Sequence, residues 1–176
     1  QITDLTPLAE LTGLRALHLQ GNDLEDLSPL AGLTNLEELR LGGGSDGRTN
    51  SRIGDLSPLS GLTNLTYLAL PPVSQIADLS PLSNLTRLKR LNFDGSWNSS
   101  QVGNITDLSP LSSLTQLEEL FLLVGPIDSL SPLSSLTNLR SLTLAGSYYT
   151  PDLSPLSTLT NLERLTLYTD GISGLS

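Results

Sequence analysis

Apolar residues recur along this 176-residue chain at short, regular intervals. One phrase, I-x-D-L-S-P-L-x-x-L-T-x-L-x-x-L-x-L, repeats through almost the whole sequence. Its opening positions are 22, 29, 23, 29, 22, 23 and 22 residues apart and fall at Ile2, Leu24, Ile53, Ile76, Ile105, Ile127, Thr150 and Ile172. A period of this length indicates a stack of short coils rather than an ordinary globular domain.

Each segment of the phrase predicts a local structure. The closing Leu-x-Leu, as in Leu17-His18-Leu19, alternates like a short strand with its leucines inward and its middle residue outward. In Leu-Ser-Pro-Leu, the Ser or Thr is expected to accept free amides of a helical turn, and the following Pro is expected to occupy the first position of that turn, with its φ angle already set. Only about five or six residues separate this Pro from the next Leu-Thr-x-Leu, which favours a 3₁₀ turn over an α-helix.

A single coil of this size cannot bury its own leucines, so the coils must stack, with parallel strands roughly 4.8 Å apart. The wording D-L-S-P-L-x-x-L-T-N-L resembles the leucine-rich repeat family and, within it, the 22-residue internalin type of bacterial surface proteins. The resemblance implies an α/β fold: a right-handed leucine-rich repeat solenoid with a parallel β-sheet on the concave face and short 3₁₀ segments on the convex face.

Two departures from the family pattern affect the expectations. The Asn that the family places after the Leu-x-Leu strand is clear only at Asn22, so we expect its ladder of buried hydrogen bonds to be largely missing. The repeats run from one end of the sequence to the other without a recognisable cap. Residues 1–176 are therefore expected to form one leucine-rich repeat domain of about seven coils, as a segment of a longer array or a unit that stacks end to end.

Composition and charge mainly exclude functions. With 9 Lys plus Arg against 18 Asp plus Glu, the net charge is −9, which argues against nonspecific nucleic-acid binding. No apolar run approaches the roughly 20 residues that span a bilayer, so membrane insertion is not expected. The absence of Cys excludes thiolate metal sites and cysteine nucleophiles.

Catalytic and metal-binding residues are not evident. His18 is the only histidine, and no spacing joins it to a Ser-His-Asp set or to paired carboxylates, so we expect no enzyme and no cofactor. One Asp per coil could be interpreted as a calcium ladder. We favour turns in which each Asp accepts backbone amides, because hard cations require six or more oxygens. This Asp column comprises Asp4, Asp26, Asp55, Asp78, Asp107 and Asp152.

The candidate binding residues are those that point out of the sheet. Tyr67, Phe121 and Leu123 are apolar positions predicted to face outward, which is typical of a partner anchor, although scattered surface aromatics are the alternative. Two units are each seven residues longer than the 22-residue period, and both excesses, at 42–52 and 94–104, follow a strand and should leave the same edge. Trp97 in the second excess contacts a partner or folds back on the sheet. The predicted partner-binding set is Arg40, Arg48, Tyr67, Arg90, Asn92, Asp94, Trp97, Phe121, Leu123, Tyr148, Tyr149 and Tyr168.

These features favour a non-enzymatic recognition module that binds a protein or a glycan through the concave face and the adjacent long loops. The internalin resemblance implies an extracellular or cell-surface protein with a macromolecular partner. Two alternatives stay open from the sequence. The first is a structural shaft or filament segment that self-associates end to end, and the second is a cytoplasmic regulatory subunit with the same 22-residue period.

Overall fold

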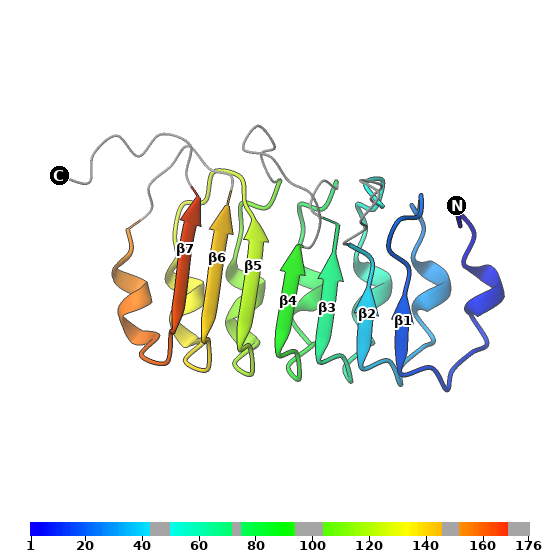
Figure 1. The fold of residues 1–176 in the computed structure, drawn as a ribbon, viewed down its shortest axis with the longest axis horizontal. Helices are drawn as coiled ribbons and strands as arrows, with labels where there is room; N and C mark the ends of the chain where they lie inside the picture. The colour runs from blue at the N-terminus through cyan, green and yellow to red at the C-terminus, as the bar shows by residue number, and fades with distance from the viewer. Residues whose placement is uncertain (43–49, 72–74, 94–103, 146–151, 169–176) are drawn as a thin grey trace.

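The computed structural model describes residues 1–42, 50–71, 75–93, 104–145 and 152–168. Within these ranges, seven parallel strands form one open sheet in chain order, which can be followed in Figure 1. Each strand pairs with the next in a register that aligns the same repeat position, so Leu39, Leu68 and Leu91 are direct neighbours. The strands are β1 (Ala16–His18), β2 (Glu38–Arg40), β3 (Tyr67–Leu70), β4 (Arg90–Phe93), β5 (Glu119–Leu123), β6 (Ser141–Ala145) and β7 (Arg164–Tyr168).

Short 3₁₀ helices occupy the side of each coil opposite the strands. The chain rises along a strand, returns behind the sheet through a 3₁₀ turn and advances to the next strand, which gives a right-handed solenoid (Figure 1). The fold prediction is therefore confirmed. The helices are η1 (Thr6–Leu8), η2 (Ser28–Leu30), η3 (Ser57–Leu59), η4 (Ser80–Leu82), η5 (Ser109–Ser113), η6 (Ser131–Ser135) and η7 (Ser154–Thr158).

The start of each 3₁₀ helix differs from the sequence prediction. Pro is its second residue rather than its first, the Ser or Thr before it makes no side-chain cap, and a Leu occupies the cap position. The Asp two residues earlier accepts the amide instead, as in the 2.8 Å bond from the Ser57 amide to Asp55 Oδ1. The Ser57 hydroxyl also donates to Asp55, so the serine is a donor to the turn rather than its acceptor.

The core is a column of leucines that runs through all coils. At the strand centres, Leu39, Leu68, Leu91 and Leu142 are 0% exposed, because each is sandwiched between the same residue of the two adjacent coils. Leu17 in the first coil is partly buried and packs against this core. Among the described residues, the large apolar side chains that are exposed lie in the first and last coils: Ile2, Leu11, Leu153 and Leu165.

Two asparagines join the first coils through side-chain bonds, so the pattern has a second member besides Asn22, the only one clear from the sequence. Asn22 Oδ1 accepts the Ile2 amide at 2.8 Å, as the family pattern requires. Asn50, which is 0% exposed, has the same role in the next coil: its Oδ1 accepts the Leu24 amide at 3.1 Å and its Nδ2 donates to the Leu41 carbonyl at 2.7 Å. The sequence did not reveal Asn50 because it lies at the far end of the first long excess rather than directly after the strand.

Candidate functional site

The outward surface of the sheet, which we call the sheet face, carries most of the predicted binding residues that the structure describes. Tyr67, Asn92 and Phe121 are half-buried there, and Arg90 is exposed. The register places Arg90 beside Tyr67 and Phe121 beside Asn92 on adjacent strands. The sheet therefore brings these predicted residues together on one surface.

Two arginines flank one tyrosine on the sheet face. The Arg40 guanidinium carbon lies 4.7 Å from the centroid of the Tyr67 ring, and the Arg90 guanidinium carbon lies 5.4 Å from it. Arg40 comes from β2 and Arg90 from β4, on either side of Tyr67 on β3. Each contact is a cation–π attraction to the electron-rich face of the ring. We call this group the arginine–tyrosine stack.

Glu38 connects the arginine–tyrosine stack to the first strand. Its Oε1 accepts a hydrogen bond from Arg40 Nε at 2.5 Å and lies 2.8 Å from His18 Nε2. Partial burial acts to raise the pKa of Glu38, but the hydrogen bonds and positive charge of Arg40 and His18 outweigh it and hold the pKa below its ordinary value of 4.5. Glu38 is therefore a carboxylate at neutral pH that neutralises Arg40.

Leu123 does not belong to the exposed surface, so its predicted place in the binding set is wrong. Leu123 is only 2% exposed, and its in-register neighbour Ala145 is 1% exposed. The following residue, Val124, is bridged to Ile105, the residue that opens the same repeat. Strict in–out alternation ends where the chain turns off the sheet, and the side chains there pack against the neighbouring coil.

Several predicted binding residues lie outside the described ranges of the chain. They are Arg48, Asp94, Trp97, Tyr148 and Tyr149, together with the side chain of Tyr168, whose backbone ends β7. Leu41 precedes the first long excess and Phe93 precedes the second, and both lie at the carboxyl ends of parallel strands. The two residues therefore lie at one edge of the sheet.

A polar ladder at the opposite edge, where the strands begin, was missed by sequence reasoning. Asn138 Nδ2 donates to the Thr115 carbonyl at 2.8 Å, and Asn161 Nδ2 donates to the Thr137 carbonyl at 2.9 Å, so each amide bonds to the coil before it. The signal was present in the sequence as the Asn of Leu-Thr-Asn-Leu. The same bond recurs from Asn35 and from Asn64 in the earlier coils.

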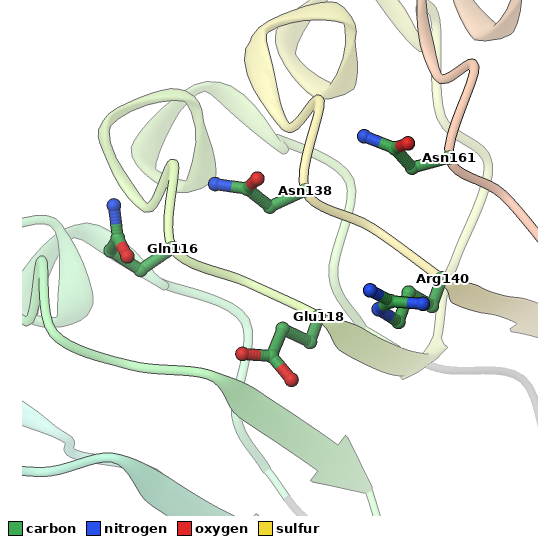
Figure 2. Close-up of a pocket in the computed structure, with 5 residues that line it drawn as sticks. All are labelled: Gln116, Glu118, Asn138, Arg140 and Asn161. Atoms are coloured by element: carbon green, nitrogen blue, oxygen red, sulfur yellow. The ribbon is translucent and has the colours of Figure 1, made fainter.

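A polar groove lies along this ladder. Figure 2 shows Gln116, Asn138 and Asn161 on successive coils, with Glu118 and Arg140 nearer the strands, around a cavity of about 240 Å³. The charged side chains are already paired, because Glu118 lies 3.2 Å from the Lys89 amine and Arg140 lies 2.5 Å from Glu163. A second groove of about 390 Å³ has the same kind of lining around Arg15 and Glu37. Both grooves are spaces between the polar side chains that join successive coils at this edge.

The Asp column acts in turns, as the favoured interpretation predicted. All six of its members accept the amide of the Ser or Thr two residues later, at 2.8 to 2.9 Å. The hydroxyl hydrogen bond and then the amide hydrogen bond lower the pKa of Asp55 and of Asp78 below 3.8. Within the described ranges, no three His, Asp or Glu side chains lie close enough together to hold a metal ion.

The helices of the described residues are all short 3₁₀ turns. Among these residues, no helix has the length and apolar character to cross a bilayer.

Comparison with solved structures places the fold among bacterial leucine-rich repeat proteins. The chain is 39% identical to an internalin C2 from Listeria monocytogenes, with a TM-score of 0.78, and the match covers 95% of this chain and 67% of that protein. It is 33% identical to the internalin InlF of the same organism, with a TM-score of 0.67, over 98% of this chain and 54% of that one. A leucine-rich repeat protein from Leptospira interrogans is 26% identical, with a TM-score of 0.72, over 94% and 40%. No protein-family model and no curated protein matches the chain.

Proposed function

Because the chain belongs to the internalin-type leucine-rich repeat proteins, which are protein-binding repeat modules in general, we propose that it recognises a protein partner through the sheet face. The observation that carries this proposal is the arginine–tyrosine stack, with Phe121 on the same surface two strands away, roughly 10 Å at sheet spacing. Arg and the aromatic residues Trp and Tyr dominate the binding energy of known interfaces.

The arrangement suits binding because its aromatic anchor is held in place before a partner arrives. Tyr67 is half-buried and flanked on both sides by arginines, so little side-chain freedom is left to lose on binding. Phe121 packs partly against the core, which fixes its base while some of its ring faces outward. A rigid anchor of this kind gains affinity by lowering the entropic cost of association.

The finer details of this function belong to the same proposal. In this proposal, Arg48, Trp97, Tyr148 and Tyr149, which lie outside the described ranges, also contact the partner. A glycan is a second ligand class, since aromatic rings on a polar surface suit sugars as well as side chains. Relatedness to internalins supports an extracellular or cell-surface location.

The test is a binding measurement on single variants. Purified bacterial and host surface proteins are arrayed, a partner of the wild-type chain is selected, and its affinity is measured for Tyr67→Ala and Phe121→Ala. Each variant is expected to lose at least about 2 kcal/mol, roughly thirtyfold in Kd, if it removes an anchor. Ser60→Ala, on the 3₁₀ side, is the matched control and should bind as the wild type does. Unchanged affinity in both sheet-face variants would reject the proposed face.

A second candidate function is structural. The exposed Ile2, Leu11, Leu153 and Leu165 of the first and last coils would be covered if copies associated end to end. Sedimentation measured over a wide concentration range tests this idea. If the folded chain stays monomeric at the highest concentration, the structural function is ruled out.

A further inference from the structure

We propose that Arg90 receives the carboxylate of an acidic side chain, Asp or Glu, presented by the partner. This inference rests on the proposed function, because it specifies what the sheet face binds and where. It starts from a single observation: Arg90 is exposed, lies over the Tyr67 ring and makes no ion pair with any described carboxylate. An arginine that is held in place without such an ion pair is a site for an anion.

The contact with Tyr67 positions Arg90 without using its hydrogen-bond donors. A ring face attracts the guanidinium charge but accepts none of its strong in-plane N–H bonds. The five N–H groups of Arg90 therefore remain available to a carboxylate, which a guanidinium binds with two parallel hydrogen bonds. Tyr67 is itself held from the other side by Arg40, so the position of Arg90 depends on three adjacent strands.

The charges nearby distinguish Arg90 from the other two cations close to the arginine–tyrosine stack, Arg40 and Lys89. Arg40 is neutralised by Glu38, and Lys89 by Glu118 at the strand-beginning edge. Glu119 lies directly beside Arg90 in the sheet register, yet the two side chains form no ion pair. The chain has twice as many acidic as basic residues. Even so, Arg90 forms no ion pair with any described carboxylate, including that of Glu119 beside it.

The side chains next to Arg90 indicate which residues of the partner would lie beside its carboxylate. Asn92 is two residues further along β4, on the same face, and is half-buried. The Cα atoms of Arg90 and Asn92 are therefore roughly 7 Å apart along the strand, so the Asn92 amide can donate to the same acidic segment. Phe121 is beside Asn92 in register and supplies an apolar flank. The chemistry thus favours an acidic residue next to an apolar one in the partner.

The experiment measures binding of a defined acidic probe to the whole chain. Tetraglutamate is titrated into the protein, and the Nε–H resonance of Arg90 is followed by NMR, with tetraglutamine and inorganic phosphate as comparison probes. Saturable shifts with tetraglutamate alone are expected. Arg90→Lys keeps the charge but loses the paired donors, and should weaken binding about tenfold. Glu119→Gln removes a competing carboxylate, and should strengthen it about threefold.

Control variants separate this site from general electrostatics. Arg140→Lys changes an arginine that is paired with Glu163 away from the sheet face, and should leave probe binding unchanged. Equal losses in Arg90→Lys and Arg140→Lys, or equal binding of tetraglutamine, would overturn the proposal. So would binding of phosphate but not of tetraglutamate. If Tyr67→Ala abolishes partner binding while Arg90→Lys does not affect it, the carboxylate proposal fails and the proposed function survives.

Discussion

Replacing Asn50 by alanine should destabilise the first coils far more than replacing an exposed asparagine. Asn50 is 0% exposed and bonds to three backbone groups: the amide of Leu24 and the carbonyls of Leu19 and Leu41. Alanine would leave these groups without the side chain that joins two adjacent coils. The Leu19 carbonyl keeps a second donor, since Asn22 Nδ2 lies 3.0 Å from it.

The magnitude follows from the two groups that lose their side-chain partner. The Leu24 amide and the Leu41 carbonyl are bonded by Asn50 at 3.1 Å and 2.7 Å. A buried donor or acceptor left unsatisfied costs about 1–3 kcal/mol, so the loss of both should cost about 2–6 kcal/mol. Most of this loss should be local, because each coil of a solenoid contacts only its neighbours.

The assay combines urea unfolding with amide hydrogen exchange. Unfolding gives the change in free energy, and exchange of the Leu24 amide reports directly on the lost bond. Asn35→Ala is the matched control, because Asn35 also donates to a preceding coil, at 2.9 Å to the Thr12 carbonyl, but in an exposed position. Water can replace that bond, so the control should lose about 1 kcal/mol or less.

Two results would refute this reasoning. The first is a loss in Asn50→Ala no larger than in Asn35→Ala. The second is unchanged protection of the Leu24 amide, which would mean that the Asn50 side chain does not satisfy it.

Three further predictions concern the core, the turns and the surface charges. Leu91→Ala should cost about 2–5 kcal/mol in urea unfolding, because Leu91 is 0% exposed, whereas Leu11→Ala, at 46% exposed, should cost much less. The lowered pKa of Asp55 means that its charge stabilises the fold above pH 3.8 and that this contribution is lost as the pH falls through the folded value, so the thermal midpoints of wild type and Asp55→Asn should converge on acidification. The exposed Arg140–Glu163 pair should contribute about 0.2–1 kcal/mol in a double-mutant cycle, and this coupling should shrink in high salt.

Local structure was largely predictable because the repeat encodes it within a few residues. The Leu-x-Leu alternation predicted the strand centred on Leu68, and Ser-Pro-Leu predicted a short 3₁₀ turn at η3 (Ser57–Leu59). The prediction of Ser57 as an acceptor was wrong, because Asp55 is a better acceptor for the same amide and the serine hydroxyl then donates to it.

The candidate site was predicted incompletely. Outward alternation predicted that Tyr67 and Phe121 lie on the sheet face, where both are half-buried, but it was extended too far along β5 and included Leu123, which is buried where the chain leaves the sheet. Asn50 was missed because a long excess separates it from the strand that it serves. When extra residues separate such an asparagine from its strand, it no longer falls at the usual spacing of the repeat and cannot be identified from that spacing.

The sequence by itself determined the period, the short strands, the 3₁₀ turns and the leucine column, because each depends on residues close together in one coil and repeats in the next. Only the tertiary structure decided which outward side chains meet. Arg40, Tyr67 and Arg90 are 27 and 23 residues apart, and they meet because the register of β2, β3 and β4 places Arg90 directly beside Tyr67 and Arg40 diagonally across from it. Such contacts depend on how coils of unequal length align, and that alignment is fixed by packing of the shared core rather than by any local pattern.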